Sequence, residues 1–252
     1  MMNSATPRIP TFTGRWFTPL DPRVEDVEII DIAHALANEC RFTGHTKRFY
    51  SVAQHSVLVS SIAARAAQAK ECGKSYIQTV ALWGLLHDAA EAYLRDFSRP
   101  LKHGWAGVGA AYRAVENRIM DAVCDKFELP HAMPAEVREA DERLGTTEWR
   151  DLMKPPAVES GYYAEPLPAA IVPWRPAEAK GRFLMCFDAI ARGWFHNGEA
   201  ICVTPKRLGE AFAWDLVEME TIERCAWTTV VDVITTAINE ALARCLKAEE
   251  LI

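Results

Sequence analysis

The chain has 252 residues, of which 50% are hydrophobic and 25% are charged, and its formal net charge at pH 7 is −6. This length and composition indicate a globular protein with a sizeable core, built as one large domain or two small ones. The acidic balance argues against the broad basic surface of a protein that binds duplex nucleic acid. A single nucleotide needs only a local group of cations and is not excluded.

The spacing of the cysteines and the lengths of the apolar runs indicate where in the cell the protein is found. Seven cysteines are scattered along the chain, and none forms a CxxC pair, a pattern typical of free thiols in a reducing environment. Residues 1–10 lack the apolar core of a signal peptide, and no run approaches 18 uninterrupted apolar residues. We therefore expect a soluble cytoplasmic protein that does not contact membranes.

Residues 1–23 contain several prolines and Gly14, which disfavour long helices. We therefore expect an extended arm there, with short strands near residues 11–13 and 16–18. Trp16 and Phe17 are expected to anchor this arm on the body. Beyond it, apolar residues recur at helical spacing almost throughout. The periodicity predicts helices over residues 31–40, 51–66, 75–92, 107–128, 135–153 and 177–195, and a long helical region after residue 204.

The predicted fold class is therefore all-α. We expect one main helical domain over residues 24–196 and a C-terminal helical extension, residues 197–252, packed on it. Residues 95–106 are predicted to be a loop. The proline-rich residues 154–176 are predicted to be one long connection, of the kind that often forms a lid.

Two of the helices are predicted to begin at a capping box, in which a Ser precedes a Gln by three positions. Ser51 and Gln54 form the first of these pairs, and Ser75 and Gln78 form the second. One residue past Gln54, His55 lies on the apolar stripe, so its imidazole is predicted to face the core.

Further ionisable side chains stand on inward faces of the predicted helices. His87 and Asp88 interrupt an apolar run, Glu91 follows one turn later, and Asp141 lies on the inward stripe of a third helix. Burying a charge costs several kcal/mol unless it is paired or bound to a metal. Gly84, one turn before Asp88, is predicted to leave room for a close neighbour.

Two imidazoles and two carboxylates suit one divalent ion such as Mn, Co, Fe, Zn or Mg. Each residue alone has an ordinary explanation, because a lone His on an apolar face is usually a satisfied core residue and a lone Asp is usually a surface or capping residue. An ordered set on three inward faces is harder to explain in that way. We therefore expect a metal site made by four residues, His55, His87, Asp88 and Asp141.

The order H…HD…D resembles the HD superfamily of metal-dependent phosphohydrolases, and most closely its bacterial 5'-deoxynucleotidase branch with phage and prophage relatives. The resemblance covers about residues 25–155. The matching segments are Arg41-Phe42, Ser51-Val52-Ala53-Gln54-His55-Ser56, His87-Asp88-Ala89-Ala90-Glu91, Asp96, Pro100-Leu101-Lys102, Ala140-Asp141 and Glu148-Trp149-Arg150-Asp151-Leu152.

The resemblance implies a role for each matching side chain. The four ligands His55, His87, Asp88 and Asp141 would hold one metal ion. Glu91 would handle the attacking water, since a carboxylate can accept its proton. Arg41 would hold the phosphate, because a guanidinium fork matches phosphate oxygens.

Four more residues are candidates beside that core. Asp96 matches a family residue near the scissile phosphate and the sugar, and it is the second catalytic candidate. Phe42 stands where the family has a Trp; it can pack on a deoxyribose but lacks the indole N–H. His45 and Lys102 lie in predicted loops and could meet phosphate oxygens.

His103 and His131 would suit a subtype of the superfamily that binds two metals. Neither stands in a motif that matches that subtype, so we expect one metal ion.

These observations predict a metal-dependent phosphohydrolase whose substrate is a small nucleotide, foremost a 5'-(deoxy)nucleoside monophosphate. Three alternatives stay open: a dNTP triphosphohydrolase, a ppGpp hydrolase, and a non-catalytic nucleotide-binding HD module. A dNTP triphosphohydrolase needs more cations to bind the additional phosphates. These could be supplied by Lys47, Arg48, Arg95, Arg99 and Lys102. We also expect a homodimer.

Overall fold

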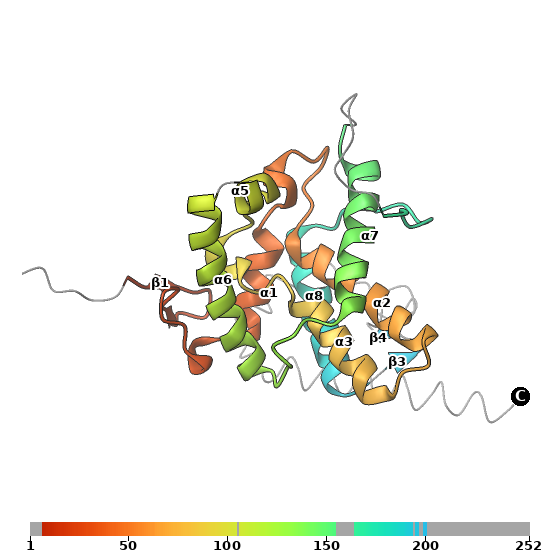
Figure 1. The fold of residues 1–252 in the computed structure, drawn as a ribbon, viewed down its shortest axis with the longest axis horizontal. Coiled ribbons are helices and arrows are strands. Elements are labelled where there is room, and N and C mark those ends of the chain that lie inside the picture. Colours follow the sequence, from red (N-terminus) through yellow and green to blue (C-terminus); the bar gives the residue numbers. More distant parts are fainter. Residues whose placement is uncertain (1–6, 105, 155–163, 194, 197–198, 201–252) are drawn as a thin grey trace, which may run out of the picture. The chain divides into compact units, whose positions relative to one another are not determined.

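The computed structural model of the chain describes residues 7–104, 106–154, 164–193, 195–196 and 199–200. All of them belong to one compact unit, Met1–Cys202. This part of the chain is mostly helical (Figure 1), which confirms the predicted all-α class. The predicted C-terminal extension lies outside the described residues, apart from residues 199–200.

Among the described residues, helices form the body and strands form two small hairpins. The α-helices are α1 (Ile29–Asn38), α2 (Val52–Ala69), α3 (Lys74–Leu86), α4 (Glu91–Leu94), α5 (Arg99–Gly104), α6 (Ala106–Lys126), α7 (Ala135–Leu152) and α8 (Pro176–Ala191). Two 3-10 helices are η1 (Val24–Asp26) and η2 (Arg41–Gly44). Strand β1 (Ile9–Pro10) pairs antiparallel with β2 (Trp16–Phe17), and β3 (Phe195–His196) pairs antiparallel with β4 (Glu199–Ala200).

Helix α2 is the centre of the packing, since it contacts α1, α3, α7 and α8 (Figure 1). Small residues make these contacts close: Ala53, Ala63, Ala64 and Ala67 of α2 are buried. The approach to α3 is close at Gly84, where an added Cβ would lie 2.7 Å from the Cα atom of Ser60. The predicted close neighbour of Gly84 is therefore the backbone of α2.

The N-terminal arm is a hairpin held on the body by hydrogen bonds and by aromatic packing. Thr13 donates from its amide and its hydroxyl to the buried carboxylate of Asp31, at 2.7 and 2.9 Å. Phe17 is fully buried and stacks on Tyr93 with 3.7 Å between ring centroids. The prediction for Trp16 is wrong, because 57% of that residue is exposed. Phe17 alone of the two aromatic residues anchors the arm, since successive strand residues point to opposite faces.

The predicted helix over residues 75–92 begins within one residue of its expected start, but Ser75 is not its N-cap and the helix ends six residues early. Helix α3 begins after Gly73, which is its N-cap, and it ends at Leu86 with His87 as its C-cap. After it the backbone tightens into i to i−3 bonds, with the amide of Ala89 donating to Leu86 at 2.8 Å and that of Glu91 to Asp88 at 3.0 Å. The His-Asp pair thus lies at the end of a helix, and Glu91 opens the separate helix α4.

The capping prediction at Ser51 is half confirmed. Its hydroxyl accepts from the amide of Gln54 at 3.1 Å, but the Gln54 side chain does not return to Ser51. Instead the Gln54 amide group donates to the carbonyl of Val172 at 2.8 Å and accepts from the amide of Trp174 at 2.7 Å. The described part of the long connection, residues 164–175, is therefore fastened to the start of α2.

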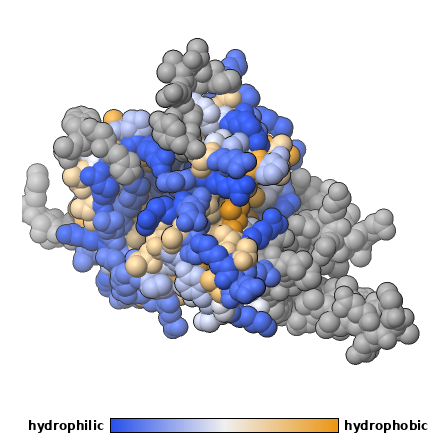
Figure 2. Space-filling view, turned by 45° about the vertical axis from the view of Figure 1, so that its right-hand side comes forward, coloured by the Kyte–Doolittle hydropathy of each residue, from blue (hydrophilic) through white to orange (hydrophobic). Residues whose placement is uncertain are grey.

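The predicted loop over residues 95–106 contains the short helix α5. On the face shown in Figure 2, hydrophilic residues predominate and apolar residues lie between them in small groups. Among the described helices, none combines the length and apolarity that a membrane span requires. Within the described part of the chain, Cys40, Cys72, Cys124 and Cys186 form no disulfide bond.

The close approach at Gly84 predicts a stability effect. Gly84→Ala should lower the free energy of unfolding by about 1–3 kcal/mol, because the new Cβ meets backbone that cannot rotate away. Gly107→Ala in α6 is the matched control, since nothing lies within 4 Å of the added Cβ there. That variant should be unchanged or stabilised by up to about 1 kcal/mol through better helix propensity. Urea unfolding followed by circular dichroism measures both, and equal effects would contradict the packing described here.

Candidate metal centre

Three helices bring four ionisable side chains together. His55 comes from the first turn of α2, His87 and Asp88 from the end of α3, and Asp141 from α7. The Nε2 atom of His55 lies 3.2 Å from Nε2 of His87, 3.1 Å from Oδ1 of Asp141 and 3.8 Å from Oδ2 of Asp88. Nε2 of His87 lies 3.2 Å from the same Asp88 oxygen.

A subset of this group has the spacing that a metal ion requires. His55, His87 and Asp88 each offer a ligand atom within 4.8 Å of the others, so the three could hold an ion. The expected fourth ligand, Asp141, is not one of this group of three: it lies 3.1 Å from Nε2 of His55, and 35% of the Asp141 side chain is exposed.

The other ring nitrogens of the two histidines fix how the imidazoles are protonated. Nδ1 of His55 lies 2.7 Å from the carboxylate of Glu148, and Nδ1 of His87 lies 2.8 Å from the carbonyl of Gly84. Both partners only accept hydrogen bonds, so each Nδ1 carries a proton. In the neutral rings both Nε2 atoms are then lone pairs that face each other, which favours a cation between them.

The pKa values of these side chains are shifted by burial and by their neighbours. Burial and the charge of Arg41 lower the pKa of His55, but Glu148 and Asp141 outweigh them and raise it to about 9. Although burial acts the other way, His87, His55 and Arg41 hold the pKa of Asp88 well below its usual range. His55 and His87 likewise hold the pKa of Asp141 at about 2. Both carboxylates are ionised at neutral pH, and a proton on His55 occupies the place that a cation would take.

Glu91 is buried beside this group with an incomplete set of partners. Only 7% of the residue is exposed, and within the described part of the chain its Oε2 atom has no hydrogen-bond partner. Burial raises the pKa of Glu91, and the charges of Asp88 and Asp96 raise it further. Burial also raises the pKa of Asp96, which is half-buried after α4. A buried carboxyl oxygen without a partner among the described residues, in the field of Asp88 and Asp96, fits a site that takes an additional polar ligand.

Arg41 is held against the group by two carboxylates. Its Nε and Nη2 atoms lie 3.2 and 3.1 Å from Oε2 of Glu148, and its Nη1 atom lies 3.4 Å from Oδ2 of Asp88. The side chain of Glu148 is fully buried. The sequence interpretation missed the role of Glu148, although its place two turns after Asp141 on the inward stripe of α7 was a usable signal.

The remaining candidates lie at different distances from this arrangement. Phe42 packs edge-on against Trp149 at 6.4 Å, and the Arg41 guanidinium lies 5.6 Å above the Phe42 ring. His45 follows in the C-cap of η2 and is exposed. Lys102 lies in α5 and not in the predicted loop, and its Nζ atom is 2.5 Å from a carboxylate oxygen of Glu116.

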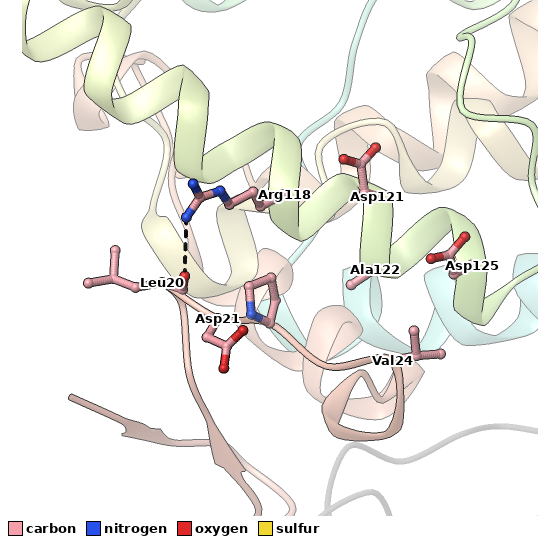
Figure 3. A pocket seen from close by; sticks show the side chains of 8 residues that line it. Leu20, Asp21, Val24, Arg118, Asp121, Ala122 and Asp125 are labelled. Atoms are coloured by element: carbon pink, nitrogen blue, oxygen red, sulfur yellow. Dashed lines mark hydrogen bonds between the residues drawn. The ribbon is translucent and has the colours of Figure 1, made fainter. Parts of the chain in front are cut away.

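His131 belongs to another part of the molecule. Its ring nitrogens lie 2.9 Å from Asp121 and 3.0 Å from Asp125. Both aspartates line a cavity of about 330 Å³ between the arm and α6 (Figure 3), where Arg118 donates to the carbonyl of Leu20. His131 thus gives no support to a second metal beside His55, and the side chain of His103 lies outside the described part of the chain.

Comparison with known proteins shows the family but not an activity. No family model matches the chain. YfdR of Escherichia coli strain K12 is 34% identical over 190 residues, which are 73% of this chain and 95% of YfdR. A Rhodobacter capsulatus protein is 39% identical over 140 residues, which are 55% of this chain and 67% of that protein. The chain belongs to the YfdR family. Both relatives are described as uncharacterized, so membership assigns no chemistry.

The shifted pKa of His55 predicts a pH effect in the metal-free protein. The folded value, about 9, lies above the unfolded value of about 6.5. The stabilisation is therefore complete below pH 6.5 and is lost as pH rises through 9. It amounts to something on the order of 3 kcal/mol at 1.36 kcal/mol per pKa unit. Urea unfolding of EDTA-treated protein at pH 7 and pH 9.5 should show this loss, and His55→Asn should show less of it. A His131→Asn control that loses the dependence equally would contradict the assignment.

Proposed function

We propose that this protein is a metal-dependent phosphohydrolase of the HD superfamily that acts on small nucleotides. Its foremost substrate would be a 5'-(deoxy)nucleoside monophosphate, cleaved to nucleoside and phosphate. The observation behind the proposal is that His55, His87 and Asp88 offer ligand atoms close to one another, with Asp141 3.1 Å from His55 and the guanidinium of Arg41 against Asp88.

The donor set fits one divalent ion, because two imidazole nitrogens and two carboxylates suit Mn, Co, Fe, Zn or Mg. His55, His87, Asp88 and Asp141 would hold it. When bound, such an ion lowers the pKa of a water and polarises a phosphoryl oxygen.

Glu91 would act as the general base. It is buried, its Oε2 atom has no partner within the described residues, and its pKa is raised by burial and by Asp88 and Asp96. A carboxylate with a raised pKa is a stronger base than one in water, so it can accept a proton from the attacking water near neutral pH. Asp96 would sit beside the scissile phosphate and the sugar, and its own charge helps to raise the pKa of Glu91.

Arg41 would hold the phosphate and stabilise the charge that grows on it during the reaction. Stabilisation of this kind is normally the largest contribution to phosphoryl transfer. Phe42, directly beside Arg41, would pack on the sugar. Both Phe42 and Thr43 have φ of +53°, a conformation that non-glycine residues adopt at a cost, so the backbone here is held in one arrangement.

Cations around the site already have partners, which favours a monophosphate over a triphosphate as the substrate. Lys102 is paired with Glu116, Arg95 is paired with Glu39 at 3.2 Å, and Lys47 donates to a backbone carbonyl at 3.2 Å. Arg41 is paired as well, but it lies directly against the candidate ligand Asp88. Each further phosphate group would need another of these cations to leave its partner, so a dNTP or ppGpp is the less favoured substrate.

The proposal is tested by stripping the protein of metal and restoring Mn, Co or Mg one at a time. Each form is then offered nucleoside monophosphates, deoxynucleoside monophosphates, dNTPs and ppGpp. Release of inorganic phosphate from the monophosphates is the expected result. Triphosphate released from dNTPs would favour the first alternative, and pyrophosphate released from ppGpp the second. No turnover with any metal would leave the nucleotide-binding module and end the enzyme proposal.

Removal of one ligand should abolish the chemistry without unfolding the chain. Asp88→Ala is expected to lower kcat by at least about 10³-fold and to abolish stable Mn²⁺ binding, because two of the closest contacts in the group are lost. Phosphate release and metal content after dialysis measure the two effects. Full activity in this variant would show that the site is wrongly placed.

A second prediction concerns phosphate recognition. Arg41→Lys keeps the positive charge but loses the fork, so kcat/KM for a monophosphate should fall by about 10- to 100-fold. Lys102→Met should have a much smaller effect, because Lys102 is already paired with Glu116. Steady-state kinetics on the two variants makes the comparison. An equal loss in both would instead support a substrate with more than one phosphate.

A further inference from the structure

Glu148 stands between the two halves of the proposed site. Its Oε1 atom lies 2.7 Å from Nδ1 of His55, and its Oε2 atom takes both Nε and Nη2 of Arg41 at 3.2 and 3.1 Å. The Glu148 and His55 side chains have no exposed surface, and Arg41 has 13%. One carboxylate therefore contacts a candidate metal ligand and the candidate phosphate-binding residue at the same time.

Burial fixes the orientation of the Glu148 carboxylate and of its two partners. A carboxylate removed from water is stable only when it is paired and hydrogen-bonded. The positive charge of Arg41 and the contact with His55 hold the pKa of Glu148 below its usual range, although burial opposes them. The side chain is thus an anion that cannot turn to solvent, and it can keep its two partners only in their present orientations.

The two contacts have separate consequences. On the histidine side, an accepting oxygen at Nδ1 leaves Nε2 as the lone pair that faces His87 and Asp141. On the arginine side, Glu148 occupies the Nε edge of the guanidinium and leaves Nη1, which lies 3.4 Å from Asp88, turned toward the site. The same carboxylate thus orients one group toward a metal ion and the other toward an anion.

We propose that Glu148 is a positioning residue that sets both the metal affinity of His55 and the phosphate affinity of Arg41. The histidine half rests only on the ability of the group to hold an ion, and the arginine half rests on the proposed function. Because each half has its own ligand, the two can be measured apart.

The test uses Glu148→Gln in the full chain, with Glu136→Gln as the matched control. Glu136 is also a buried glutamate of α7, but it binds Lys70 and Tyr76, at 3.0 Å each. An amide has one acceptor oxygen in place of two, so the glutamine side chain of the first variant cannot satisfy His55 and Arg41 together. Calorimetric titration with Mn²⁺ gives the first affinity, and titration of the Mn²⁺-loaded protein with inorganic phosphate gives the second.

Glu148→Gln is expected to weaken Mn²⁺ binding by about 10- to 100-fold, the range for loss of a partner behind a metal-binding histidine. It is also expected to weaken phosphate binding, and Arg41→Lys should weaken phosphate binding alone. Glu136→Gln should leave both affinities within about twofold of the original. Circular dichroism shows whether each variant is folded, and Glu148→Asp, which keeps the charge, serves if the Gln variant is not.

Folded Glu148→Gln that binds Mn²⁺ as tightly as Glu136→Gln would overturn the inference, as would an original chain that binds no Mn²⁺. Its failure differs from that of the proposed function. A protein whose Mn²⁺ affinity falls in Glu148→Gln but which hydrolyses no nucleotide refutes the function and keeps the metal half of the inference. Turnover with an unchanged Mn²⁺ affinity in Glu148→Gln does the reverse.

Discussion

The pairing of the Glu148 carboxylate with His55 and Arg41 is the contact on which the candidate centre depends. Arg41 and His55 come from neighbouring elements, η2 and α2, whereas Glu148 comes from α7, 93 positions after His55, and almost none of the surface of the three side chains reaches water. Removing any one of them would leave a buried charge or donor unpaired, at a cost of several kcal/mol. The pairing therefore holds α7 along the start of α2, and with it Asp141, two turns before Glu148, beside Nε2 of His55.

The other half of the centre depends on close backbone packing. Helices α2 and α3 run in opposite directions, and they touch where Gly84 meets Ser60. His55 lies on α2 before this contact and His87 lies just after it at the end of α3, so the contact brings the two imidazoles to 3.2 Å. The carbonyl of Gly84 also accepts from Nδ1 of His87. One glycine thus allows the approach and orients a ligand.

Local pattern in the sequence was enough to predict the fold class and most helices, because apolar spacing and proline positions act over a few residues. The helix over residues 135–153 is confirmed within one residue as α7. The break after Leu86 was not predictable in this way, since His87 and Ala90 keep helical dihedral angles and only the hydrogen bonds shift from i−4 to i−3. The pattern at Trp16 likewise did not say which face of the hairpin is buried.

The candidate ligands were predictable as a set, because their order resembles a known pattern. Their partners were not. The contact of Glu148 with His55 spans 93 positions and that with Arg41 spans 107, and no local rule links residues so far apart. The pairing of Lys102 with Glu116 was not predicted either. It gives a candidate for phosphate binding a carboxylate partner of its own.

If this group of side chains holds one divalent ion, the ion can be located directly. Crystals of the full chain grown with Mn²⁺ should show one anomalous-scattering peak within ligand distance of His55, His87 and Asp88, with Asp141 completing the set. The peak should disappear in Asp88→Ala. No peak in this group, or a peak beside His131 and Asp121 in its place, would contradict the account.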